Sequence, residues 1–341
     1  MLTTKKLKSD LIGNIFLLFI VIIIFFSVFE VSVRILWKDQ RNDYPLEMFI
    51  RDETKGYVMT PNYSGSFVSS QYKKIPIEIN SKGLRDYEHD YNKSDETIRI
   101  LFLGDSVTFG AGINLKDSYT KLFEKTLNKK EQKFETINMG VSGYEIEQEY
   151  SYYFEEGFKY NPNIVVISIV LNDIQNVNIL EVQKNWFESE NSFERIVKKF
   201  CLSCKFTYSK IKDISESSEE YNQEYFENIY YKWNESEFEL YSEKIISLNE
   251  NITKSQGKLV LVIIPYTQQF TNWQDYGTLP QEKLKDFGKK ENIEVIDMMP
   301  YLDNPNFEKY YFPADNVHPT EDGHKLINAG LLKEFSIREI I

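Results

Sequence analysis

The chain has 341 residues, of which 42% are hydrophobic, so it can form one large domain with appendages and bury a sizeable core. Its formal net charge of −12 opposes a phosphate backbone, so nucleic acid is not expected as a partner. The two cysteines lack a second cysteine pair or a histidine cluster, which excludes an ordinary zinc site, and no metal or cofactor is expected.

The first expected element is a membrane anchor. Residues 11–29 (LIGNIFLLFIVIIIFFSVF) are almost purely apolar, and as a helix they would span about 28 Å, close to the thickness of the hydrocarbon core. No small-residue cleavage pattern follows, so we predict an uncleaved single-pass anchor over residues 11–36. Lysines at positions 5, 6 and 8 place residues 1–10 in the cytoplasm and the remaining chain outside the cell membrane.

Beyond the anchor, residues 37–95 are irregular, and we expect a juxtamembrane arm with a few short strands. From residue 96 to residue 341, apolar runs alternate with helical spacing. Strands are expected at residues 98–103, 134–139, 164–170, 259–264 and 295–296, and helices at residues 118–127, 144–157 and 321–335. This alternation predicts a three-layer α/β/α sandwich with a central, mostly parallel sheet.

A polar and aromatic stretch at about residues 175–256 interrupts the alternation, and we interpret it as an insertion or cap over the carboxyl edge of the sheet. Residues 221–249 within it are compatible with a long helix. Both cysteines, Cys201 and Cys204, also lie in this stretch. They are either two thiols or a local disulfide.

Polar residues and glycines follow the expected strands, where parallel sheets place their ligands and catalytic groups. Ser106 follows the first strand, Gly140 the second and Asn172 the third, while Asp315 and His318 precede the last helix. A serine hydroxyl needs a base such as His318, and a carboxylate such as Asp315 can fix the imidazole tautomer. The amides of Ser106 and Gly140 and the side chain of Asn172 are suitable donors to an oxyanion.

These segments resemble the SGNH (GDSL-like) hydrolase family over about residues 96–335. The matching pieces are GDSVTFG at residues 104–110, Gly140, the Asn172-Asp173 pair and DNVHPT at residues 315–320. The resemblance implies an SGNH, flavodoxin-like fold, with Ser106 as nucleophile and His318 and Asp315 completing the triad. It assigns the oxyanion hole to Ser106, Gly140 and Asn172. One departure is Val170, where the family often has glycine, and we expect that side chain to pack or to line a narrower site.

The arm also resembles membrane-anchored bacterial members of the family, through Glu30, Arg34 and the segment NSKGLR at residues 80–85. Related proteins remove or transfer acyl groups on cell-envelope polysaccharides. The resemblance therefore implies a serine esterase, an O-acetyl esterase of a cell-surface polysaccharide, that works through an acyl-enzyme. The first alternative is an O-acyltransferase with the same triad, which would need a membrane partner to supply acyl groups. The second is a non-catalytic glycan-binding module.

Four other residues are interpreted differently. Ser142 is a competing nucleophile, but its surroundings do not form the G-x-S-x-G elbow. We expect Asp173 to be structural, His324 to be a surface or packing residue, and His89 to be solvated.

Overall fold

The computed structural model describes residues 2–36, 45–68, 74–129, 131–175, 178–183, 201–204, 206–207, 210–211, 219–233, 235–271, 278–303, 305–313, 315 and 317–341. The chain forms two compact units. The first consists of Met1–Asp39 and Glu188–Tyr221, and the second of Gln40–Phe187 and Asn222–Ile341.

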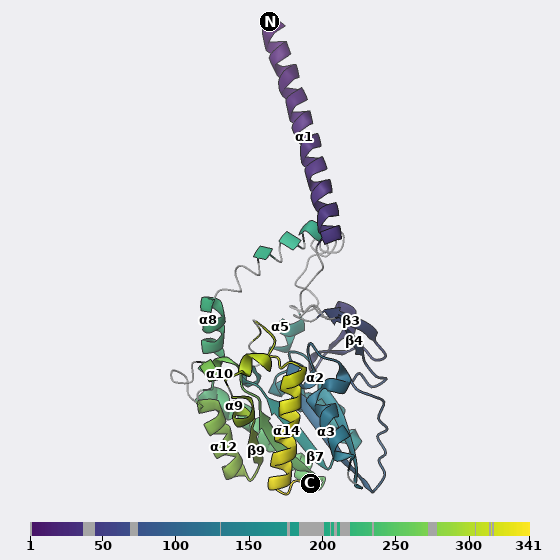
Figure 1. The fold of residues 1–341 in the computed structure, drawn as a ribbon, viewed down its shortest axis with the longest axis vertical. Coiled ribbons are helices and arrows are strands. Elements are labelled where there is room, and N and C mark those ends of the chain that lie inside the picture. The colour runs from purple at the N-terminus through teal and green to yellow at the C-terminus, as the bar shows by residue number, and fades with distance from the viewer. Residues whose placement is uncertain are drawn as a thin grey trace. The chain divides into compact units, whose positions relative to one another are not determined.

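The first unit contains helix α1 (Leu2–Leu36), drawn in purple in Figure 1. Its part Gly13–Leu36 is long and apolar enough to cross a membrane, with a mean hydropathy of 2.9. The apolar side chains from Ile15 to Phe26 are exposed around the helix. Such a surface is stable only against other apolar material, which agrees with the expected anchor.

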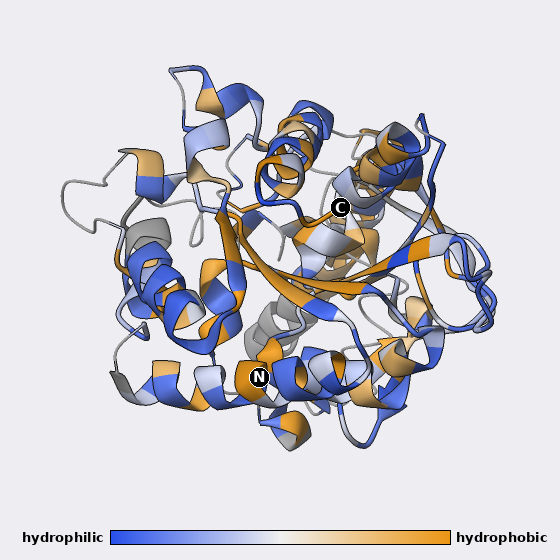
Figure 2. Ribbon diagram, turned by 90° about the horizontal axis from the view of Figure 1, so that it is seen from below, coloured by the Kyte–Doolittle hydropathy of each residue, from blue (hydrophilic) through white to orange (hydrophobic). Residues whose placement is uncertain are grey.

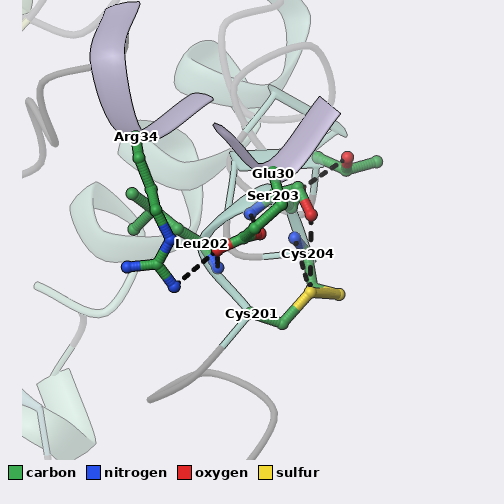
Figure 3. Close-up of a disulfide and its surroundings, with 7 residues drawn as sticks. Glu30, Arg34, Cys201, Leu202, Ser203 and Cys204 are labelled. Atoms are coloured by element: carbon green, nitrogen blue, oxygen red, sulfur yellow. Dashed lines mark hydrogen bonds and ion pairs between the residues drawn. A yellow bond between two sulfur atoms is a disulfide. The ribbon is translucent and has the colours of Figure 1, made fainter. Parts of the chain in front are cut away.

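The same unit holds a disulfide between Cys201 and Cys204, which decides between the two alternatives left open by the sequence. Figure 3 shows the disulfide segment against Glu30 of α1. The two oxygens of that carboxylate accept the backbone N–H groups of Leu202 and Ser203, at 3.1 and 2.8 Å. Arg34 lies one turn further along α1 and pairs with the same carboxylate at 2.6 Å. Glu30 thus satisfies backbone donors that would otherwise be left without partners.

The second unit is built on a five-stranded sheet. Its strands are β5 (Thr97–Gly104), β6 (Lys133–Gly140), β7 (Ile164–Ile169), β8 (Lys258–Ile263) and β9 (Glu294–Asp297). The order is β6-β5-β7-β8-β9, and every neighbouring pair is parallel. Each central strand is a continuous apolar run because helices cover both of its faces. Figure 2 shows the apolar sheet in orange between two layers of helices, which confirms the predicted three-layer sandwich.

The longer helices form these layers. Helix α3 (Tyr119–Leu127) packs beside α14 (Glu321–Ile337), with the rings of Phe123 and Phe335 5.0 Å apart. In the other layer, α9 (Glu235–Lys254) contacts α4 (Ile146–Glu155) and α12 (Leu279–Glu291). Helix α9 joins β7 to β8, so it is a crossover helix that packs on the sheet. The remaining helical elements among the described residues are η1 (Leu46–Met48), α2 (Ser106–Phe109), η2 (Leu115–Asp117), η3 (Gly157–Tyr160), η4 (Leu171–Ile174), α5 (Ile179–Gln183), α8 (Glu219–Tyr230), α10 (Gln268–Thr271), α13 (Met299–Leu302) and η6 (Phe307–Lys309).

The arm between the anchor and the sheet is built from two antiparallel strand pairs. These are β1 (Phe49–Asp52) with β2 (Gly56–Met59), and β3 (Ser64–Val68) with β4 (Lys74–Glu78). The described arm residues belong to the same compact unit as the sheet.

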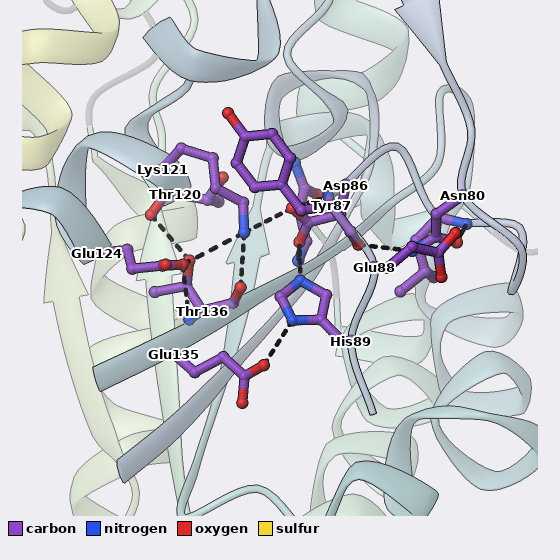
Figure 4. Close-up of polar contacts among 12 residues, drawn as sticks. Asn80, Asp86, Tyr87, Glu88, His89, Thr120, Lys121, Glu124, Glu135 and Thr136 are labelled. Atoms are coloured by element: carbon purple, nitrogen blue, oxygen red, sulfur yellow. Dashed lines mark hydrogen bonds and ion pairs between the residues drawn. The ribbon is translucent and has the colours of Figure 1, made fainter. Parts of the chain in front are cut away.

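A polar network joins the end of the arm to β6 and α3, as Figure 4 shows. Asp86 is buried and accepts the Lys121 ammonium at 2.6 Å and the backbone N–H of Asn138 at 2.7 Å. His89 lies 3.1 Å from the Asp86 carboxylate and 2.7 Å from Glu135. The expectation that His89 is solvated is wrong, because this pair of carboxylates gives the buried imidazole partners.

Candidate active site

The tight turn between β5 and α2 presents Ser106 at the carboxyl edge of the sheet. Gly104 has φ +153°, and a Cβ at this position would lie 2.2 Å from the hydroxyl oxygen of Thr108, so the turn requires glycine. Asp105 then caps α2 by accepting the backbone N–H of Val107 at 2.9 Å. Ser106 is therefore the first helical residue, beside the point between β5 and β7 where the strand order reverses.

Ser106, His318 and Asp315 form one hydrogen-bonded chain. The Ser106 Oγ lies 2.7 Å from His318 Nε2, and His318 Nδ1 lies 2.7 Å from Asp315 Oδ2. Because a carboxylate accepts at Nδ1, the neutral imidazole carries its proton there and leaves Nε2 free to accept from the serine hydroxyl. The fold thus brings together the residues expected as nucleophile and base, which lie 212 positions apart in the sequence.

The electrostatics of this chain favour a charged imidazole. Burial by itself would lower the pKa of His318, but the Asp315 carboxylate outweighs it and raises the pKa above the ordinary value of 6.5. Burial would raise the pKa of Asp315, yet its contacts with His318 and with two backbone N–H groups hold the pKa below 3.8. Asp315 is therefore an anion that can stabilise the imidazolium formed when Ser106 loses its proton.

Asp105 is a second acidic neighbour of the nucleophile, and our sequence analysis did not consider it. Its Oδ2 lies 3.1 Å from the Ser106 hydroxyl. Burial raises the pKa of Asp105, although contacts with the Val107 N–H, His318 and Ser106 oppose the rise. Burial also raises the pKa values of Glu149 and Asp173 well above their ordinary values, and the negative charge of Asp105 adds to both shifts. Asp105 therefore adds to the rise in the pKa of His318, together with Asp315.

Asn172 lies in η4, directly after β7, and so at the same edge as Ser106. Its Oδ1 accepts the hydroxyl of Tyr266, and its Nδ2 makes no hydrogen bond to any of the described residues. Asp173 accepts the backbone N–H of Val170 at 2.8 Å, which is the structural role expected for it. Val170 is 1% exposed, so its side chain packs in the core and does not line the site.

Gly140 is placed differently from the expectation. Its N–H donates to Asn138 Oδ1 at 2.9 Å, so this amide is not free to donate to an oxyanion. A Cβ on Gly140 would lie 2.2 Å from the Phe109 backbone nitrogen, which gives the glycine a packing role against α2. The N–H groups of Ser142 and Gly143, later in the same loop, make no hydrogen bond to the described part of the chain. Gly143 is exposed, with φ +78°.

The remaining candidates from the sequence do not form part of this chain of contacts. His324 is fully buried, and its Nδ1 accepts the backbone N–H of Tyr119 at 3.1 Å. Burial lowers the pKa of His324 to about 3, so it is a neutral packing residue. The carbonyl of Ser142 accepts the Tyr57 hydroxyl at 2.7 Å. Among the described residues, no group of three or more histidine, cysteine, aspartate or glutamate side chains could hold a metal ion.

The chain is similar to several solved structures at low sequence identity. TesA is 11% identical, with 70% of this chain and 97% of that chain covered and a TM-score of 0.46. A catalytic mutant of Axe2, an acetylxylan esterase from Geobacillus stearothermophilus, is 18% identical over 72% of this chain and 96% of that chain, with a TM-score of 0.43. A member of the lipolytic protein G-D-S-L family from Veillonella parvula is 16% identical over 70% and 98%, with a TM-score of 0.41. No curated protein matches the chain.

The model of one protein family matches residues 102–326, which is most of the second unit. That family is described as the GDSL-like lipase/acylhydrolase family. The matched range contains Ser106, Asn172, Asp315 and His318. The chain therefore belongs to the GDSL-like lipase/acylhydrolase family of ester-bond hydrolases.

Proposed function

We propose that this protein is a serine esterase that removes O-acetyl groups from a cell-surface polysaccharide. One observation carries the proposal: the continuous hydrogen-bonded chain from Ser106 Oγ through both nitrogens of His318 to the Asp315 carboxylate. A hydroxyl beside a basic imidazole, which a carboxylate behind it orients and supports, is equipped for acyl transfer.

The reaction runs in two halves. Ser106 Oγ attacks the ester carbonyl while His318 Nε2 takes the hydroxyl proton, and a tetrahedral oxyanion forms. The intermediate collapses when the bond to the sugar oxygen breaks, and His318 returns the proton to that oxygen. Water then attacks the acetyl-enzyme with His318 again acting as the base, and acetate leaves with Ser106 restored.

The oxyanion needs donors that are aimed at the reaction centre before the reaction begins. In our proposal, these are the backbone N–H of Ser106, which also contacts the Asp105 carboxylate, the Nδ2 of Asn172 and the backbone N–H of Gly143. Gly143 takes the place first expected for Gly140, because the Gly140 amide already donates to Asn138. The exposed backbone of Gly143 and the unoccupied donor of Asn172 support this choice.

The substrate class is proposed from the location of the site. The apolar helix Gly13–Leu36 anchors the chain, and the lysines before it favour a cytoplasmic N-terminus and an outward-facing site. The disulfide between Cys201 and Cys204 supports this topology, because such bonds persist in oxidising compartments and are rare in the cytosol. Acetylated envelope glycans are esters that such an enzyme would meet.

The test uses the full-length chain in detergent with two readouts. A fluorophosphonate should label wild-type protein at Ser106 and should not label Ser106→Ala. Wild-type protein should then release acetate from an acetylated polysaccharide, and Ser106→Ala and His318→Ala should lose this activity to a similar degree, because triad members act as a unit. Acetyl transfer to an added glycan without net acetate release would instead identify an acyltransferase. Binding of the glycan without labelling or turnover would identify a binding module.

A further inference from the structure

The turn that carries Asn172 is fixed from three sides. Asp173 Oδ2 accepts the backbone N–H of Val170 at 2.8 Å within the turn itself. The indole Nε1 of Trp233, a residue that is 1% exposed, donates to the Leu171 carbonyl at 2.9 Å. These two contacts hold the backbone, but neither determines which way the Asn172 side-chain amide faces.

The third contact reaches that amide, and it comes from the neighbouring strand. β8 pairs with β7 in parallel, with Ile263 opposite Ile169, and the Ile264 N–H continues the ladder by donating to the Ile169 carbonyl at 2.8 Å. The carboxyl ends of the two strands therefore lie side by side. Tyr266 follows β8 by three residues, and its hydroxyl donates to Asn172 Oδ1.

A carboxamide has one acceptor oxygen and one donor NH₂ group, which point in different directions. With Oδ1 held by a donor, Nδ2 must face the other way. A flipped amide would present its oxygen to the reaction centre, and an oxygen there would repel a developing oxyanion. A phenol oxygen can also accept an N–H, so Tyr266 selects the useful orientation by acting as the donor to Oδ1.

Tyr266 is well suited to be a permanent donor. The side chain is 2% exposed, and its ring packs near Phe226 at a centroid distance of 6.5 Å. Burial raises the pKa of Tyr266 well above 10, and the nearby Tyr225, Asp105, Asp173 and Asp315 add to the rise. The phenol thus keeps its proton at neutral pH.

We propose that Tyr266 is a positioning residue, whose hydroxyl orients Asn172 so that Nδ2 donates to the oxyanion. The inference rests on the proposed esterase function and deepens it, because it explains how one donor is preorganised. Tyr266 touches neither the substrate nor Ser106 in this role. Its effect is transmitted entirely through Asn172.

The test compares Tyr266→Phe with Tyr311→Phe in the full-length protein, using p-nitrophenyl acetate as substrate. Tyr311 is an equally buried tyrosine, 2% exposed, whose hydroxyl donates to the Pro265 carbonyl at 2.7 Å. Both variants lose one buried hydrogen bond, so both should have a lower Tm. Only Tyr266→Phe should lower kcat, by about tenfold with KM unchanged, since one oriented hydrogen bond is at stake. Kinetics are measured well below each Tm.

A double-mutant cycle completes the experiment. Because Tyr266 acts through Asn172, the double variant Asn172→Ala/Tyr266→Phe should be no slower than Asn172→Ala alone. The positioning role would be wrong if Tyr266→Phe lowered kcat by the same factor in the wild-type enzyme and in the Asn172→Ala variant. It would also be wrong if Tyr266→Phe changed only KM, or left kcat at the wild-type value. Fluorophosphonate labelling of wild-type Ser106 separates this failure from a failure of the proposed function, which would show as an unlabelled wild-type enzyme.

Discussion

Asp315 holds His318 at two points: its Oδ2 lies 2.7 Å from the imidazole Nδ1, and its Oδ1 accepts the backbone N–H of His318 at 3.0 Å. The same Oδ1 also accepts the backbone N–H of Val317 at 3.0 Å. One carboxylate therefore fixes both the side chain and the main chain of the base. The short D-x-x-H spacing makes this possible, because the carboxylate folds back over the turn that carries the histidine.

Replacing Asp315 with alanine should change the pH profile as well as the rate. The carboxylate raises the pKa of His318, so its removal should lower this pKa and move the acid limb of kcat/KM to lower pH. The plateau value of kcat/KM should fall by about 10⁴-fold, which is the usual cost of losing the carboxylate that fixes the tautomer of the imidazole. The profile is measured with an acetyl ester from acid to neutral pH. An unmoved acid limb would mean that another group sets the pKa of the base.

The two glycines after β6 should respond differently to alanine. Gly140→Ala brings a Cβ to 2.2 Å from the Phe109 backbone nitrogen, so it should mainly lower Tm, with an overpacking cost of about 1–3 kcal/mol. Gly143→Ala strains a residue at φ +78° on the exposed loop and should mainly lower kcat by displacing the proposed donor. Thermal melting and acetyl ester kinetics on both variants test the contrast. If Gly140→Ala lost more kcat for each degree of lowered Tm than Gly143→Ala did, Gly140 would again be the candidate donor.

Arg85 should be essential for stability although it lies in the arm. Its guanidinium donates to the carbonyls of Phe109, Gly110 and Ile113 at 2.9, 2.6 and 2.7 Å, and the side chain is 1% exposed. Arg85→Met should lower the free energy of unfolding by about 3 kcal/mol or more, because it leaves three buried carbonyls without this donor. Urea unfolding measures the change. Arg51→Met, at an exposed arm position, is the control and should stay within about 0.5 kcal/mol of wild type.

The proposed topology predicts a protection pattern. Protease added to intact spheroplasts should digest the chain after the anchor and spare the N-terminal lysines, because short basic ends are retained in the cytoplasm. Epitope tags at the two ends allow both fragments to be followed. Protection of the C-terminal tag until the membrane is lysed would reverse the orientation, and it would also remove surface glycans as substrates.

The sheet was predictable from the sequence because its signals are local. The buried runs at β5, β7 and β8 are continuous and rich in strand formers, and the structure finds each of them within one residue of the expected ends. The helix expected at residues 221–249 is divided into α8 and α9, with Trp233 buried between them. Helical spacing continues across that break, so the pattern alone did not reveal it.

The sequence is least informative about residues whose surroundings are made by distant segments. His89 lies in a polar stretch, but Asp86 and Glu135 bury it and give it partners. Gly140 has the right residue type at the right strand end, yet β6 extends to include it opposite Gly104, and its amide is occupied. Tyr266 carried no local signal at all, because its contact with Asn172 exists only once β8 lies beside β7.

The separation between Ser106 and His318 has a consequence for biosynthesis. Ser106 directly follows the first strand of the sheet in the sequence and His318 follows the last, so a nascent chain carries the serine without the histidine until almost all of it has been made. The other strands of the sheet all lie between these two residues in the sequence, and contacts over such long separations form late and slowly during folding. Partly synthesised or truncated chains would be inert toward esters. In the proposed mechanism, ester hydrolysis therefore begins only when the completed polypeptide has folded.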